Sequence, residues 1–130
     1  MLALGLDIGT SKICVTIIDC KSGLCIENFH DDNDTFIKIN GKSSKMQDAV
    51  AIKQKALTLL NTAIDKYPDI KCIGVTGQMH GIIYLDSDNN ILSPLYTWQD
   101  ESSDSNYHYL NISYAKKLSD MTGYKMASGY

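Results

Sequence analysis

Continuous apolar runs open the chain and predict buried strands. Residues 2–6 are apolar apart from one glycine and end at Asp7, and residues 13–18 form a second run. A run without polar alternation is typical of a strand that is covered on both faces. Residues 24–29 predict a third strand after a turn, so the first thirty residues predict an antiparallel meander.

The spacing changes to a helical period in the middle of the chain. Residues 35–43 read as a connector that turns at Gly41, and residues 44–47 match a capping box with Ser44 as the N-cap. Pro68 should end the helix. Apolar residues then share one helical face, which indicates core packing and no cofactor role: Ala49, Ile52, Ala56, Leu59, Leu60, Ala63, Ile64 and Tyr67.

The remaining elements follow from the same patterns. Residues 70–76 predict a strand that pairs parallel to the first one, because a long helix separates them. Residues 82–86 and 91–96 predict two further strands around a polar turn. A helix over residues 113–122 should end at Gly123. The order that results for residues 1–76 is β-β-β-α-β.

Composition narrows the class of protein. The 130 residues suffice for one domain with a modest core, and the net charge of −3 disfavours a nucleic-acid surface. No apolar run approaches the roughly 20 residues that span a bilayer, and the first residues read as a core strand, so we expect a cytoplasmic protein without a membrane partner. The four cysteines lack metal-type spacing, and Cys14 and Cys72 lie in apolar strand patterns, which predicts buried free thiols.

The first candidate binding site along the chain is the stretch Asp7-Ile8-Gly9-Thr10-Ser11. The backbone N–H groups of a tight turn at Gly9, together with the hydroxyls of Thr10 and Ser11, can hold phosphate oxygens. Asp7 repels phosphate but can bind Mg²⁺, which bridges to it. An ordinary hairpin with a polar turn fits this stretch equally well.

Two further motifs could read sugar hydroxyls. Gly77-Gln78-Met79-His80-Gly81 follows the parallel strand, at the end where α/β sheets bind ligands. Gln78 can donate and accept hydrogen bonds, as neutral His80 can. Trp98-Gln99-Asp100 joins an aromatic ring to a carboxylate. The alternatives are local packing of His80 and a Trp98 in the core.

In this order the three motifs resemble the N-terminal part of the FGGY carbohydrate kinases, over essentially the whole chain. The Gln-Met-His-Gly form at residues 78–81 looks like the xylulokinase and sedoheptulokinase branches. The closing residues 122–130 lean toward sedoheptulokinase-like members. The resemblance implies an α/β domain of the actin-like, ribonuclease-H-like type, with a mixed sheet that starts β-β-β-α-β.

The resemblance also implies a reaction and its site. ATP with Mg²⁺ would be the phosphoryl donor, and a ketose or polyol would be the acceptor. Asp7 would face the Mg²⁺, and Gly9, Thr10 and Ser11 would lie near the γ-phosphate. The sugar site would be lined by Gln78, Met79, His80, Trp98 and Asp100. Cys14 and Glu101 stand where many members carry a basic residue.

Length shapes the remaining expectations. Family members are much longer, and their catalytic base and adenine site lie in later sequence, so we expect residues 1–130 to be the N-terminal piece of the first FGGY domain. Such a piece should be inactive alone, and the strand at residues 72–76 should lie at an exposed edge that favours a homodimer. A non-enzymatic actin-like protein of the cell-division type and a stand-alone sugar-binding module are the alternatives.

Overall fold

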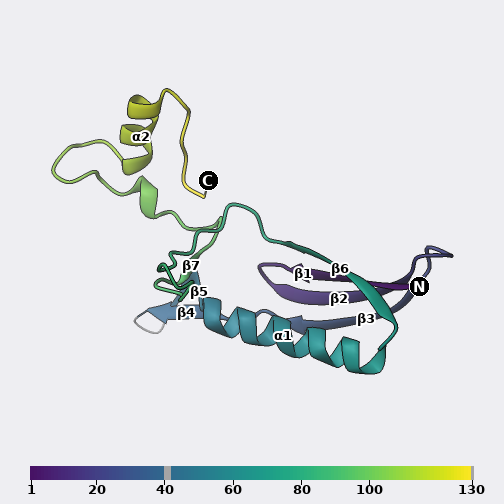
Figure 1. Ribbon diagram of the computed structural model, residues 1–130. Helices are drawn as coiled ribbons and strands as arrows, with labels where there is room; N and C mark the ends of the chain where they lie inside the picture. The colour runs from purple at the N-terminus through teal and green to yellow at the C-terminus, as the bar shows by residue number, and fades with distance from the viewer. Residues whose placement is uncertain (40–41, 130) are drawn as a thin grey trace. The chain divides into compact units, whose positions relative to one another are not determined.

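The computed structural model describes residues 1–39 and 42–129, in two compact units (Figure 1). The first unit consists of Met1–Thr35 and Asp48–Gln78, and the second consists of Phe36–Gln47 and Met79–Tyr130. The expected turn at Gly41 lies outside the described residues. Each unit carries part of the predicted chemistry, and each is taken by itself below.

The first unit is a four-stranded mixed sheet with the order β3-β2-β1-β6. β1 (Leu2–Ile8), β2 (Lys12–Asp19) and β3 (Cys25–Asp32) form the predicted antiparallel meander. β6 (Ile70–Gly77) pairs parallel to β1, as expected for a strand that follows a long helix. The predicted β-β-β-α-β order is therefore confirmed for this unit.

One helix, α1 (Ala49–Lys66), covers one face of this sheet. The predicted capping box is wrong: residues 44–47 belong to β5 (Lys42–Gln47), and the N-cap is Asp48. The Asp48 carboxylate accepts hydrogen bonds from the N–H groups of Val50 and Ala51, at 2.9 and 3.0 Å. A charged acceptor at this position satisfies two N–H groups of the first turn.

The core of this unit lies between α1 and the sheet. Alternate residues of two strands and one stripe of the helix are buried there: Leu4, Leu6, Ile13, Val15, Ile17, Ala49, Ile52, Ala56 and Ala63. The other sheet face carries small and polar side chains, among them Gly5, Cys14 and Thr16, which are only partly buried. The continuous apolar runs therefore bury one face, and not both as predicted.

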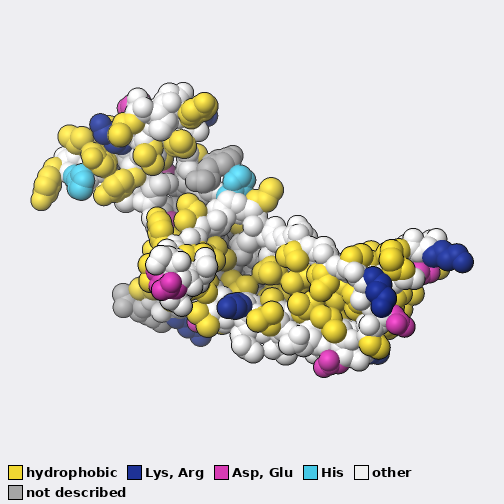
Figure 2. All heavy atoms as spheres, viewed as in Figure 1, with side chains coloured by type: hydrophobic (Ala, Val, Ile, Leu, Met, Phe, Trp, Pro, Cys, Tyr) yellow, Lys and Arg dark blue, Asp and Glu magenta, His cyan; other side chains and the backbone are white. Residues whose placement is uncertain are grey.

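β6 forms an open edge of the sheet. Its residue Val75 pairs with Leu6 and shares that residue's face, yet Val75 is 68 % exposed while Leu6 is 7 % exposed. The difference arises because α1 packs on the other three strands. Figure 2 shows hydrophobic side chains gathered over the strands of this unit. The predicted exposed edge is confirmed.

The cysteines are free but are not buried in the way expected. Cys14 is half-buried, whereas Cys20, Cys25 and Cys72 are exposed. Cys72 is exposed because it pairs with Ala3 on the sheet face that α1 does not cover. The prediction of free thiols is confirmed, and that of a buried Cys72 is wrong.

The second unit has a small antiparallel sheet, β4-β5-β7. β4 (Phe36–Ile39) and β5 replace the connector predicted over residues 35–43, and β7 (Leu95–Tyr96) is short. The two strands predicted at 82–86 and 91–96 reduce to β7 and isolated bridges, Ile82 to Tyr96 and Leu85 to Ile91.

Two short helices follow in this unit, η1 (Ser102–Asp104) and α2 (Tyr114–Thr122). Ser113 caps α2, and Gly123 ends it with φ of 75° in the left-handed region that glycine adopts readily. This helix is as predicted. Among the described residues, no helix is long and apolar enough to cross a membrane.

Candidate functional site

The turn between β1 and β2 is tight and requires glycine. The Gly9 N–H donates a hydrogen bond to the Lys12 carbonyl oxygen at 2.9 Å. A Cβ atom on Gly9 would lie 2.9 Å from the same oxygen, closer than a side chain tolerates without movement of the backbone. Asp7 is exposed near the end of β1, on the sheet face away from α1.

Gln78 is joined to this turn. Its backbone N–H donates to the Ile8 carbonyl oxygen at 3.0 Å, and its side-chain oxygen accepts a hydrogen bond from the Thr10 hydroxyl at 2.9 Å. A Cβ atom on Gly77 would lie 3.0 Å from the Ile8 oxygen, so glycine also allows this close approach. The end of β6 and the first turn therefore form one structure within the first unit.

Asn33 stabilises the same turn through two hydrogen bonds. Its side-chain N–H donates to the Gly9 carbonyl oxygen and its backbone N–H donates to that of Ser11, each at 2.8 Å. The side-chain oxygen of Asn33 accepts the Thr35 hydroxyl at 2.7 Å, and Asn33 is only 2 % exposed. Sequence reasoning missed this residue, because an asparagine in an acidic stretch carries no signal of its own.

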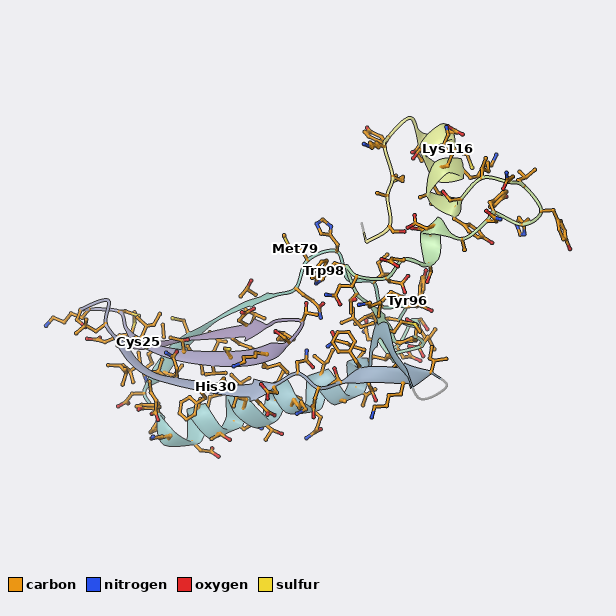
Figure 3. The ribbon with its side chains drawn as sticks, turned by 180° about the vertical axis from the view of Figure 1, so that it is seen from behind. Cys25, His30, Met79, Tyr96, Trp98 and Lys116 are labelled. Carbon is orange, nitrogen blue, oxygen red and sulfur yellow. The ribbon has the colours of Figure 1, made fainter. Side chains whose placement is uncertain are left out.

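In the second unit, a turn after β7 presents Trp98 and Asp100. Thr97, 2 % exposed, donates its hydroxyl to the Lys45 carbonyl oxygen at 2.7 Å and accepts the Gln99 N–H at 3.2 Å. The Asp100 N–H donates to the Thr97 carbonyl oxygen at 2.9 Å. Trp98 is 48 % exposed, so the alternative of a core tryptophan is wrong (Figure 3).

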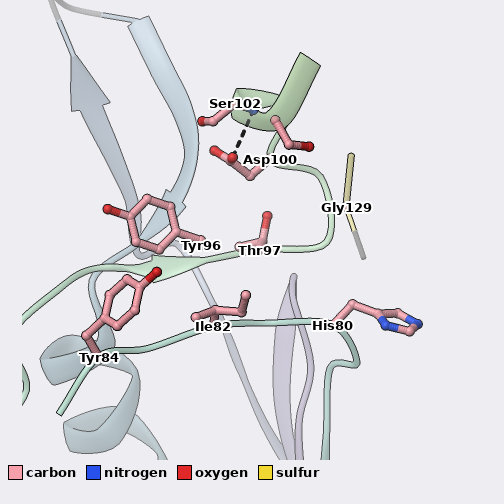
Figure 4. A pocket seen from close by; sticks show the side chains of 9 residues that line it. His80, Ile82, Tyr84, Tyr96, Thr97, Asp100, Ser102 and Gly129 are labelled. Carbon is pink, nitrogen blue, oxygen red and sulfur yellow. Dashed lines mark hydrogen bonds between the residues drawn. The ribbon is translucent and has the colours of Figure 1, made fainter. Parts of the chain in front are cut away.

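A pocket of about 230 Å³ lies within this unit. Both His80 and Asp100 line it, as the resemblance implied, but in Figure 4 the His80 imidazole points away from Asp100. One Asp100 oxygen accepts the Ser102 N–H at 3.0 Å, which fixes the carboxylate. The pocket is lined by His80, Ile82, Tyr84, Tyr96, Thr97, Asp100, Ser102, Ser103 and Gly129.

The other expected sugar-site residues lie elsewhere. Met79 and Trp98 are exposed and do not line this pocket, and Gln78 belongs to the first unit. Tyr84 was not predicted, although an alternating pattern could have found it. His80, Ile82 and Tyr84 are two residues apart, and alternate side chains of an extended segment lie on one side.

Comparison with known proteins decides the family. Residues 2–130 match the family model of the N-terminal domain of the FGGY family of carbohydrate kinases. The chain belongs to this family. The fold is the α/β, actin-like ATPase type with a mixed sheet that the motifs implied. A non-enzymatic cell-division protein is therefore not favoured.

The FGGY chain is similar to xylulose kinases. It is 29 % identical over 99 residues to that of Staphylococcus xylosus, covering 75 % of this chain and 20 % of the relative. It is 24 % identical over 128 residues to that of Bacillus subtilis strain 168, covering 98 % and 26 %. These matches agree with the predicted xylulokinase-like branch.

A solved structure agrees as well. The crystal structure named as a xyloylose kinase from Brucella ovis superposes with a TM-score of 0.76 at 26 % identity, covering 100 % of this chain and 27 % of that one. The FGGY chain thus spans about a fifth to a quarter of the length of these relatives.

Proposed function

We propose that residues 1–130 form part of the first domain of a sugar kinase, which transfers the γ-phosphoryl group of ATP to a hydroxyl of a ketose or polyol. The observation that carries the proposal is the pair of hydrogen bonds that Gln78 makes, one donated to the Ile8 carbonyl oxygen and one accepted from the Thr10 hydroxyl. They join the turn proposed for phosphate to the segment that leads into the acceptor motif. Phosphoryl transfer depends on precise positioning of the phosphate, and these bonds hold the turn in place.

Asp7 and the first turn are proposed to serve the nucleotide, with Gly9, Thr10 and Ser11 near the phosphates. The cradle at Gly9, which a Cβ atom would fill, suits the approach of phosphate oxygens to backbone N–H groups. Within residues 1–39 and 42–129, no three His, Cys, Asp or Glu side chains are placed to hold a metal ion together. A single carboxylate suits Mg²⁺, which keeps several waters and takes other ligands from the substrate.

Mg²⁺ bound there would neutralise charge on the phosphates during transfer. Asp7 is the residue proposed to hold it, through water or directly. Cys14 pairs with Asp7 across β1 and β2, at the position where many members carry a basic residue, so the turn lacks a side-chain cation there. Mg²⁺ would then supply the charge neutralisation that a basic residue at position 14 supplies in those members.

The acceptor is proposed to bind in the second unit, near Met79, His80, Trp98 and Asp100. The Asp100 carboxylate, held by its bond from Ser102, can accept hydrogen bonds from sugar hydroxyls. The exposed Trp98 ring can pack against the C–H groups of the sugar. Besides its expected contact with the sugar, Gln78 is assigned a second role, because its side chain accepts the Thr10 hydroxyl and so holds the turn proposed for phosphate. Because the relatives are xylulose kinases, xylulose is the first acceptor to test.

Turnover is proposed for a protein of the relatives' length. None of the residues assigned above is a catalytic base or an adenine contact, so the 130-residue chain should bind ATP weakly and transfer no phosphoryl group. The open β6 edge, with Val75 exposed, suits a homodimer of this chain. Light scattering across concentrations measures that association.

Chemical-shift mapping tests the assignment on the isotope-labelled chain. Xylulose should shift the amide signals of residues 79–81 and the indole N–H of Trp98. ATP with Mg²⁺ should shift those of residues 9–11. A xylulose titration that shifts no signal, or shifts signals scattered over both units, would contradict the acceptor assignment.

A further inference from the structure

The pocket of the second unit is lined by two kinds of side chain. Asp100, Ser102 and Ser103 bring polar groups, whereas Tyr84 and Tyr96 bring aromatic rings. The two ring centroids are 6.3 Å apart at an interplanar angle of 74°, an edge-to-face pair. In Figure 4 the ring pair lies at the opposite end of the pocket from His80.

Backbone pairing fixes where these rings lie. Tyr96 pairs with Met46 in the β5–β7 ladder and, on its other side, exchanges two hydrogen bonds of 3.0 Å with Ile82. Tyr84 donates its N–H to the Ser93 hydroxyl and accepts the Leu92 N–H, each at 2.9 Å. Both tyrosines therefore occupy defined positions before any ligand arrives.

The size and surface of the pocket indicate its ligand. About 230 Å³ is below the roughly 300–1,000 Å³ that is typical of drug-sized ligands, so the pocket suits a small molecule and not a nucleotide. Tyr84 is 60 % exposed, which leaves a large ring surface facing solvent. A sugar offers both C–H groups for such a ring and hydroxyls for a carboxylate.

We infer that Tyr84 and Tyr96 form a carbon-chain subsite for the acceptor, an inference that rests on the proposed function. The rings contact the C–H groups of the sugar, while the Asp100 carboxylate accepts hydrogen bonds from its hydroxyls. The two tyrosines thereby select acceptors whose carbon chain contacts the rings while a hydroxyl bonds to Asp100. None of the three sequence motifs contains either tyrosine.

Xylulose titration of the labelled 130-residue chain tests this inference. Tyr84→Leu and Tyr96→Leu should each weaken xylulose binding by about tenfold, the lower range for loss of an apolar pocket contact. Tyr84→Phe and Tyr96→Phe keep the rings and should stay within twofold of the parent. Tyr109→Leu is the matched control, because Tyr109 is fully exposed and lies outside the pocket.

The outcomes separate this inference from the proposed function. If xylulose shifts Trp98 equally in the parent and in both leucine variants at the same affinity, the subsite is wrong and the acceptor assignment stands. If xylulose does not bind the parent chain, both are wrong. If Tyr96→Leu unfolds the chain, Tyr84→Leu decides, since its largely exposed ring is dispensable for packing.

Discussion

The β1–β2 turn and the pocket of the second unit differ in how their residues are held. The turn is closed by backbone hydrogen bonds, by the buried Asn33 and by the close approach of Gly77 to Ile8. The pocket is built on an irregular hairpin with isolated bridges, and its aromatic walls are partly exposed. A rigid turn suits phosphate, whose shape is fixed, and an open aromatic pocket suits a choice among sugars.

The largest loss of stability should come from Gly9→Ala, which disrupts the β1–β2 turn. The new Cβ atom meets the Lys12 oxygen at 2.9 Å, so the turn must open, at a cost of about 1–3 kcal/mol. Urea unfolding measures this cost. Gly5→Ala is the matched control in β1, because its Cβ atom would have no neighbour within 4 Å. Equal stability of the two variants would show that the turn is not tight.

Asn33→Ala should cause the next largest loss of stability. It removes the donor to Gly9 and the acceptor for Thr35, which leaves buried polar groups unsatisfied, at a cost of about 2 kcal/mol. Asn28→Ala is the control, since Asn28 is exposed. Thermal unfolding compares the two, and a smaller loss for Asn33→Ala than for Asn28→Ala would contradict the bracing role.

In the second unit, Thr97→Val keeps the shape of the side chain but removes two hydrogen bonds, and should cost about 1 kcal/mol. The emission of Trp98, the single tryptophan, should also change, because the next residue in the chain loses its anchor. Thr62→Val on the exposed face of α1 is the control. An unchanged Trp98 emission spectrum would contradict the role of Thr97 in positioning the turn after β7.

The smallest effect concerns pH. Lys66, and after it the Tyr67 hydroxyl, lowers the pKa of Glu27 below its ordinary value of 4.5, where β3 meets the end of α1. A lowered carboxyl pKa adds stability that is present above 4.5 and is lost as the pH falls through the folded-state pKa. Glu27→Gln should therefore flatten the acid side of the stability curve, and Glu101→Gln should not. Identical curves for all three chains would refute the contribution.

The sequence predicted the first unit well because its signals are local. The apolar runs predicted β1 and β2, and the helical stripe predicted α1. The long helix before β6 predicted that β6 pairs parallel to β1. The capping box at Ser44 failed because a strand competed for those residues, and Asp48 offered a stronger cap. The uncovered sheet face could not be predicted, since an apolar run does not say whether a second layer is present.

The pocket was harder to predict. Motifs identified His80 and Asp100, which both line it, but Tyr84 and Tyr96 are brought there by a bridge between Ile82 and Tyr96. The contact of Gln78 with Thr10 joins positions 68 residues apart. Such pairings depend on tertiary structure, and residue spacing alone does not reveal them.

The most direct test of the account compares the parent chain with Asp7→Asn for binding of ATP, with and without Mg²⁺, and of xylulose, by chemical-shift titration. The variant should lose the Mg²⁺-dependent part of ATP binding at residues 9–11 and keep xylulose binding at Trp98. Asp65→Asn on α1 should behave as the parent. Equal Mg²⁺-dependent ATP binding by Asp7→Asn and the parent would contradict the central claim that the first turn is the metal-nucleotide site.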